Sequence, residues 1–328
     1  MRRGARSLPV FRLGWTVCIA FLLTPLLSFA SPFPTRDQNP LLAGFGLPTS
    51  LPAQPADDGT WHAGIDLNWS SSAIMQSTAD ENLVVDAETR ELRLTVERPI
   101  SRHWVARLEL PYRYTGAGNL DSFIDGWHDF FGLPQGARPL MPRDQLHIAY
   151  DRDGNAILDL QSSVEGIGDA TLAAGYRWLA NDRGALTAWF NVKVPTGDAD
   201  KLTGSGATDV SLALAGQRRL AERWSVFGQL SATWLGDADI PLAPQHSSVF
   251  AGFGGVGYNA WRGLDLKIQF DAHSAAYESN LDYLGPAGIL TLGGSYRFAS
   301  GWQFDFGVSE DVMVDASPDV VFVFGLRR

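Results

Sequence analysis

Cysteine is almost absent from this chain of 328 residues, because Cys18 is the only one. It lies in an N-terminal segment with four arginines, an apolar run from Leu13 to Leu27 and the small-residue end Ser28-Phe29-Ala30. This layout is typical of a secretory signal peptide, residues 1–30, and we expect cleavage after Ala30. The run is interrupted by Pro25 and is shorter than the roughly 20 residues of a spanning helix, so an uncleaved anchor is the less favoured alternative. The exported chain then has no disulfide, thiol catalysis or cysteine-ligated metal.

Long apolar runs are missing after residue 30, where no stretch is long enough for a transmembrane helix. Basic residues are scarce as well. Removal of the signal peptide changes the net charge from −10 to about −14, which disfavours a nucleic-acid partner. An exported chain of this kind is either soluble outside the cytoplasm or a membrane β-barrel. The 11 Trp, 8 Tyr and 18 Phe favour the barrel, since aromatic side chains collect where strands cross a membrane interface.

Catalytic motifs are lacking too. The histidines, at positions 62, 103, 128, 147, 246 and 273, have no Gly-x-Ser-x-Gly or comparable nucleophile sequence beside them. Phosphate-loop and zinc-helix motifs are also missing. The best nucleophile candidate is His246-Ser247-Ser248 in an expected outer loop, which makes a lipid hydrolase the third choice of function. We predict a protein that is not an enzyme and has no catalytic residue, metal or cofactor.

What the chain has is a two-residue alternation of apolar and polar side chains beyond Gly59. From Leu264 to His273 every even residue is apolar or small and every odd residue is polar or charged, which predicts a two-faced strand. Similar faces recur over 61–69, 92–96, 104–112, 172–178, 186–194, 210–214, 224–234, 290–298, 302–308 and 320–326, with a glycine-rich stretch at 249–260. We therefore predict about 12 strands, an even number, as bacterial barrels have.

The connections between these segments are alternately short and long. Short turns are expected at 99–103, 180–184, 221–223, 261–263 and 299–301, and long loops at 74–82, 115–164, 196–205, 236–247, 275–286 and 313–318. A barrel with tight periplasmic turns and long outer loops has this asymmetry, whereas a β-sandwich has no reason for it. The predicted fold is an all-β, transmembrane antiparallel β-barrel over residues 59–328.

The longest loop, residues 115–164, has structure of its own. Phe123, Trp127, Phe130 and Phe131 recur three or four residues apart, which predicts a short helix with an aromatic face. This helix is either a lid over the barrel mouth that presents its aromatics to a solute, or a cap that stabilises the rim. Farther on, Asp151-Arg-Asp-Gly-Asn155 predicts a hairpin turn, with calcium binding as a less favoured alternative.

Residues 31–58 form an irregular leader with six prolines and no periodicity, which excludes a central strand. Its apolar residues Leu41, Leu42, Phe45 and Leu47 would be poorly solvated if left free. The leader is therefore either a plug inside the lumen or a periplasmic tail.

Three segments carry a family resemblance. They are Phe33-Pro-Thr-Arg-Asp-Gln-Asn-Pro-Leu41, the stretch from Leu120 to Pro134 followed by Gly136-Ala-Arg138, and Gly166-Ile-Gly-Asp169. Together they resemble an uncharacterised exported family, domain of unknown function 3187, over nearly the whole mature chain. Val194-Pro-Thr-Gly-Asp198 with Gly204-Ser-Gly-Ala-Thr-Asp209 is similar to a loop of outer-membrane barrels linked to uptake of phenolic and other hydrophobic compounds. The first resemblance implies a barrel and an outer-membrane location without a substrate.

If the apolar faces meet lipid, the polar faces place charges of both signs in the lumen. The lumen-lining candidates are Arg93, Glu97, Arg107, Glu109, Arg113, Arg177, Lys193, Asp265, Lys267 and Asp271. Charges in a narrow barrel must pair or hydrate, since an isolated ion out of water costs several kcal/mol. They form either a salt-bridge network that closes the lumen or the lining of a hydrated solute path.

These observations favour a channel or passive transporter in the bacterial outer membrane for a small solute, with hydrophobic and aromatic solutes as candidates. The alternative is a structural or biogenesis barrel with a closed, salt-bridged lumen and outer loops that bind a partner. The expected partners are outer-membrane lipid, the barrel assembly machinery during insertion and an unidentified small solute.

Overall fold

The computed structural model describes residues 29–55, 58–132 and 134–328. The expected signal peptide, with Cys18, therefore lies almost entirely outside the described residues. Among these residues, no helix is long and apolar enough to cross a membrane.

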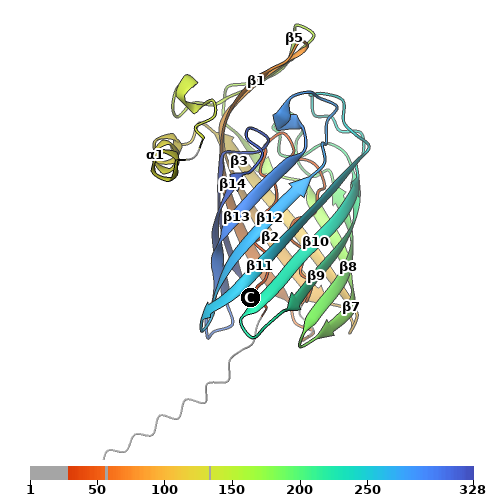
Figure 1. Ribbon diagram of the computed structural model, residues 1–328. Helices are drawn as coiled ribbons and strands as arrows, with labels where there is room; N and C mark the ends of the chain where they lie inside the picture. The colour runs from red at the N-terminus through yellow and green to blue at the C-terminus, as the bar shows by residue number, and fades with distance from the viewer. Residues whose placement is uncertain (1–28, 56–57, 133) are drawn as a thin grey trace, which may run out of the picture.

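The strands close into a 12-stranded antiparallel barrel, which confirms the predicted fold (Figure 1). The barrel strands are β1 (His62–Ser77), β2 (Glu81–Pro99), β3 (Trp104–Gly116), β7 (Ala170–Asn181), β8 (Gly184–Val194), β9 (Asp209–Arg219), β10 (Trp224–Trp234), β11 (Ser248–Trp261), β12 (Leu264–His273), β13 (Ala287–Arg297), β14 (Gln303–Asp311) and β15 (Val320–Arg327). Each strand pairs with its neighbours in sequence, and the ring closes where β1 pairs with β15. The glycine-rich stretch at 249–260 is strand β11.

The two faces of the wall follow from the alternation. In β12, Leu266, Ile268 and Phe270 are exposed on the outside, whereas Lys267 and Gln269 are buried on the inside. The same division holds around the ring, because one face of each strand must meet lipid and the other the lumen. The apolar faces therefore form the membrane-facing surface.

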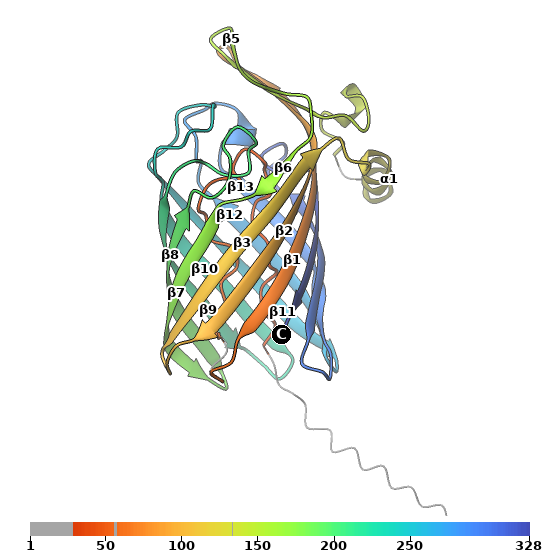
Figure 2. The ribbon, with the colours of Figure 1, turned by 180° about the vertical axis from the view of Figure 1, so that it is seen from behind.

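Long loops gather at one end of the barrel, the long-loop end, and tight turns at the other, the short-turn end (Figures 1 and 2). One expected loop is wrong. Residues 74–82 are mostly strand, because β1 and β2 continue past the rim and connect through a turn of three residues. They form a ribbon with the hairpin β4 (His147–Arg152) and β5 (Asn155–Leu160), which pairs with the upper part of β2 and turns at Asp153-Gly154.

The segment between β3 and β7 also contains a helix. Helix α1 (Asp121–Phe131) is followed by a 3-10 turn, η1 (Arg138–Leu140), and after the hairpin by the short strand β6 (Val164–Ile167), which pairs with β3. A second 3-10 turn, η2 (Asp282–Leu284), lies in the loop between β12 and β13. Helix α1 lies beside the barrel rim, outside the ring of strands (Figure 1).

The largest buried apolar cluster lies at the long-loop end. Leu41, Leu42 and Phe45 of the leader pack there with side chains of the ribbon and of the loops after β8, β10 and β12. Ile74, Leu83, Tyr150, Leu202, Ile240, Tyr277 and Tyr283 are among these partners. We call this cluster the outer cap, because it covers the mouth of the barrel.

Candidate functional site

The leader lies inside the barrel and runs up and back through the lumen (Figure 2). At the short-turn end, the Ser31 hydroxyl accepts a hydrogen bond from Gln303 Nε2 at 2.8 Å. At the long-loop end, Asn39 Nδ2 donates to the Tyr283 carbonyl at 2.7 Å. The chain then returns, and Gln54 meets Gln217 near the end of β9 at 3.0 Å. Both ends of this segment therefore lie at the short-turn end.

Side chains of the wall pair with the backbone of the leader. Gln229 accepts from Leu51 N at 2.9 Å and donates to the Thr49 carbonyl at 3.0 Å. Gln269 accepts from Phe33 N at 2.9 Å. A segment with six prolines cannot join a sheet, so these side chains satisfy backbone groups that would otherwise be buried without partners.

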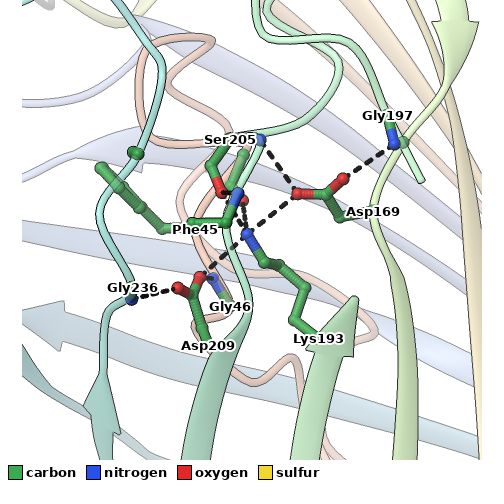
Figure 3. Close-up of polar contacts among 12 residues, drawn as sticks. Phe45, Gly46, Asp169, Lys193, Gly197, Ser205, Asp209 and Gly236 are labelled. Atoms are coloured by element: carbon green, nitrogen blue, oxygen red, sulfur yellow. Dashed lines mark hydrogen bonds and ion pairs between the residues drawn. The ribbon is translucent and has the colours of Figure 1, made fainter. Parts of the chain in front are cut away.

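Lys193 of β8 is the centre of the most connected polar site (Figure 3). Its Nζ atom lies 2.9 Å from Asp169 Oδ2 and 3.0 Å from Asp209 Oδ2, and it donates to the Gly44 carbonyl of the leader at 2.8 Å. It also contacts the Ser205 hydroxyl. The ammonium group is thus fully coordinated by two carboxylates, one hydroxyl and one leader carbonyl.

The two carboxylates of this site also receive backbone N–H groups. Asp209 accepts from Gly46 of the leader at 2.7 Å and from Gly236 at 2.9 Å, while Asp169 accepts from Gly197 at 2.8 Å and from Ser205 at 2.9 Å. Charge-assisted hydrogen bonds of this kind are stronger than neutral ones. We call Lys193, Asp169 and Asp209 the lysine site. It joins the leader to the loops after β8 and β10.

Glycine is required in the loop after β8 for this close packing. A Cβ atom on Gly204 would lie 2.4 Å from Asp169 Oδ1, and one on Gly197 would lie 2.8 Å from the Gly204 Cα atom. The glycines therefore let the backbone of this loop pack closely against the lysine site, inside the mouth of the barrel.

A second ion network lines the wall formed by β2 and β3. Glu91 accepts from Arg113 Nε at 2.8 Å and pairs with Arg93, while Arg107 pairs with Glu109 at 2.8 Å and with Glu97 at 3.2 Å. Across the lumen, Lys267 pairs with Asp305 at 2.7 Å, and Asp305 also pairs with Arg327. Buried charges of both signs thus neutralise one another in small groups.

Empty space inside the barrel is concentrated at the short-turn end. A cavity of about 700 Å³ opens there, lined by Ser31, Gln54, Arg219, Arg297 and Arg327 among others. Toward the long-loop end, a cavity of only about 40 Å³ lies between the leader and strands β10 to β12, beside Asp37 and His273. The space that the leader leaves is therefore larger at the short-turn end.

Comparison with known proteins gives the family. The model of the family described as "Protein of unknown function (DUF3187)" matches residues 15–328. The chain belongs to this family. Among proteins with curated descriptions, none matches this DUF3187 chain.

Solved structures share the architecture of this DUF3187 protein. The COG4313 outer membrane channel from Pseudomonas putida F1 is 15% identical, with a TM-score of 0.53 over 84% of this chain and 97% of that one. The KdgM porin is 8% identical, with a TM-score of 0.42 over 80% of this chain and 97% of that one. The toluene transporter TodX of Pseudomonas putida is 13% identical, with a TM-score of 0.37 over 91% and 94%. Of the three, only the COG4313 channel has a TM-score above 0.5, and it shows that this barrel fold occurs in an outer-membrane protein.

The ten expected lumen residues of the DUF3187 barrel all point inward. Arg107 is partly buried and the others are buried: Arg93, Glu97, Glu109, Arg113, Arg177, Lys193, Asp265, Lys267 and Asp271. Most belong to the two ion networks or to the lysine site. Glu91 and Asp305 also face the lumen. Because Glu91 is two residues from Arg93 on the same strand, the alternation of β2 could have identified it as a further candidate. Arg36 of the leader could not have been found in this way, because the leader has no periodicity.

The aromatic residues expected in a lid lie elsewhere. Phe123 packs on Phe322, an outward-facing residue of β15, and Trp127 Nε1 donates to Glu310 of β14 at 2.9 Å. Phe130 and Phe131 are exposed. The alternative in which α1 stabilises the rim stays a prediction. The helix lies against the outer flank of the barrel rather than over its mouth, so the lid alternative has no support. The reason is that helical periodicity reports which side chains share a face and not where the helix docks.

Proposed function

We propose that this protein is a passive channel of the bacterial outer membrane for small water-soluble solutes, closed at rest by residues 31–55. The main support for this proposal is the position of the leader. The strands alone enclose a wide lumen, and the leader fills it. The inward side chains beside it include Ser211, Ala213, Ala215, Ser225 and Gly255. Small side chains are unnecessary in a barrel that is closed by its own wall.

The lining supports a hydrated solute rather than a hydrocarbon. If the leader moves, much of the lumen is bounded by charged and amide side chains, most densely on β2, β3, β8, β12 and β14. Such a surface binds water and charged or hydroxylated solutes through hydrogen bonds. The aromatic residues of α1 lie outside the ring and give no support to an aromatic solute. Two parts of the path suit a hydrophobic solute: the apolar outer cap, and the inward apolar cluster that includes Val105, Trp189 and Ala213.

The second candidate is a structural barrel whose lumen stays closed. The lysine site favours it, because one leader carbonyl and one leader N–H are held there by buried charges. In that case the ribbon of β1, β2, β4 and β5, which extends from the long-loop end, is the expected partner-binding surface (Figure 2).

A reversible lock on the leader separates the two candidates. A Cβ atom on Gly46 would lie 2.7 Å from Asp209 Cβ, which is close enough for a disulfide after a small backbone shift. The double variant Gly46→Cys with Asp209→Cys, with Cys18 replaced, is inserted into planar bilayers. The Asp209→Cys change removes the carboxylate that binds Gly46 N and so frees the leader, which the wild type holds closed. We therefore expect conductance in the reduced state, loss of conductance on oxidation and recovery on reduction.

The matched control is the single variant Asp209→Cys, which lacks the second thiol and keeps its conductance under the same oxidation. Equal conductance of the oxidised and the reduced double variant would mean that solutes do not pass where the leader lies. Absence of conductance in the reduced double variant and in Asp209→Cys, with the barrel folded, would favour the closed structural barrel.

A further inference from the structure

Helix α1 is docked on the membrane-facing side of the barrel rather than in its mouth (Figure 1). Phe123 makes an edge contact with Phe322, with ring centroids 5.8 Å apart, and Phe322 belongs to the outward apolar face of β15. Phe322 and Phe324 share this face, and Phe324 lies 6.5 Å from Phe304 of the adjacent strand β14. The aromatic face of the helix is therefore continuous with the surface that meets lipid.

From this contact the aromatic rings continue along the helix. Phe123 stacks with Trp127 at 6.2 Å, Trp127 contacts Phe131 at 4.6 Å, and Phe131 contacts Phe130 at 4.8 Å. The three phenylalanines of the series are exposed, from 53% at Phe123 to 81% at Phe130, whereas Trp127 between them is half-buried. A contiguous aromatic surface of this kind is unfavourable in water and indicates an apolar partner.

The opposite face of the helix is acidic and is held by arginines of the following segment. Arg138 Nη1 lies 2.8 Å from Asp121, and Arg143 lies 2.6 Å from Asp125. Arg138 is itself fixed to the barrel, because its side chain also pairs with Asp319 at 2.8 Å and donates to Ser71 at 2.7 Å. The helix is therefore anchored through its polar side, which leaves the aromatic side free for another contact.

A neighbouring loop extends the apolar surface. The connection from β14 to β15 exposes Val312, Met313 and Val314, and a Cβ on Gly288 of the outer wall would lie 3.6 Å from Met313 Cγ. Leu140 of η1 is also exposed. The apolar residues outside the ring thus gather on the rim near β13 to β15, beyond the ends of the strands.

We propose that α1 lies in the plane of the membrane and inserts Phe123, Phe130 and Phe131 among the acyl chains of outer-leaflet lipid. An amphipathic helix with aromatic residues on one face and charges on the other takes this position at a bilayer interface. Lipid is the occupant because the aromatic series begins on the lipid-facing wall and continues away from it, at the rim where the leaflet ends. The role is independent of whether the lumen conducts.

Single-cysteine labelling tests the depth of the helix in the full-length protein. With Cys18 replaced, the variants Phe130→Cys, Asp129→Cys and Asn155→Cys each offer one thiol for a polarity-sensitive fluorophore. Asp129 is the neighbouring position on the acidic face, and Asn155 lies at the tip of the β4–β5 hairpin. The proteins are reconstituted in phosphatidylethanolamine and phosphatidylglycerol vesicles, and heat-modifiable migration verifies that each barrel is folded.

We expect the label at residue 130 to show blue-shifted emission, strong quenching by spin-labelled acyl chains and little quenching by iodide. The labels at residues 129 and 155 should show the reverse. If iodide quenches all three labels equally and the lipid quencher none, the aromatic face is in water and the proposal is wrong. If Phe130→Cys instead crosslinks between two copies and is shielded from both quenchers, a second copy covers this face and the proposal is equally overturned.

Discussion

At the scale of single residues, the lumen is organised by balanced pairs of charge rather than by isolated ions. A carboxylate or ammonium group without a partner is costly at this depth, and Arg113, Lys193 and Lys267 each lie within 3 Å of an acid. Lys193 differs from the others because it also binds the leader backbone and contacts Ser205 of an outer loop. Its removal therefore affects three segments at once.

We predict that Lys193→Met lowers the free energy of unfolding by about 3 to 5 kcal/mol, because Asp169 and Asp209 stay buried without their cation. The temperature at which heat-modifiable migration is lost measures the effect. Lys201→Met is the matched control. Lys201 pairs with Asp198 at 3.5 Å on the exposed part of the same loop, where a pair contributes about 0 to 1 kcal/mol. Equal stability of the two variants would mean that the lysine site does not hold the leader.

At the scale of secondary structure elements, the strands are the part of the molecule that the sequence predicts best. Leu266, Ile268 and Phe270 face outward in β12 as the alternation requires, because a strand has only two faces and lipid selects one of them. The upper ends of β1 and β2 were not predicted as strand. Their residues past the rim, such as Ile74 and Val85, belong to the ribbon and are buried against the loops and the leader. Contact with lipid therefore no longer determines which of these positions are apolar.

The sequence predicts helix α1 itself but not its position on the barrel. Its existence and its aromatic face follow from spacing alone. Its place on the flank depends on Arg138, which pairs with Asp319 far along the chain, and on Trp127, which binds Glu310. A single sequence does not reveal such contacts. His128 belongs to this helix, and its imidazole is buried with Glu310, Arg138, Asp125 and Asp129 around it.

The docking of α1 should weaken in acid. Burial lowers the pKa of His128, and the nearby guanidinium of Arg138 lowers it further. In an undocked helix, His128 has the ordinary histidine pKa of about 6.5 and therefore binds a proton more readily than in the docked helix. Docking is then strongest above that pH and is lost as the pH falls. Hydrogen exchange of the α1 amides should accelerate between about pH 8 and pH 5 relative to the intrinsic rate.

His128→Gln is the control for this effect, since a neutral side chain of similar size has no proton to gain. Protection of its α1 amides should be independent of pH over the same range. If wild type and variant respond alike, a different group is responsible for any acid response.

At the scale of the whole molecule, the arrangement of the leader could not be derived from the sequence. Its prolines exclude a strand and its apolar residues require cover, and both facts suit a plug as well as a tail folded on another surface. The structure places Leu41, Leu42 and Phe45 in the outer cap, where loops separated by hundreds of residues meet. Arg36 donates to the carbonyls of Ala43, Phe45 and Leu47, which keeps the turn of the leader compact inside the bore.

The direction of the barrel in the membrane follows from its two unlike ends. Tight turns face the periplasm and long loops the exterior in bacterial barrels, so the segment after α1 should be accessible from outside the cell. Arg143 is exposed in that segment, whereas Arg102 and Arg183 are exposed at short turns.

Trypsin added to intact cells should therefore cut after Arg143, and cuts at Arg102 and Arg183 should require permeabilised cells. Arg36, partly buried in the lumen and bonded to three leader carbonyls, should resist trypsin from both sides as long as the barrel is folded. Cleavage at Arg183 in intact cells would reverse the orientation, and early cleavage at Arg36 would show that the leader leaves the lumen without a solute.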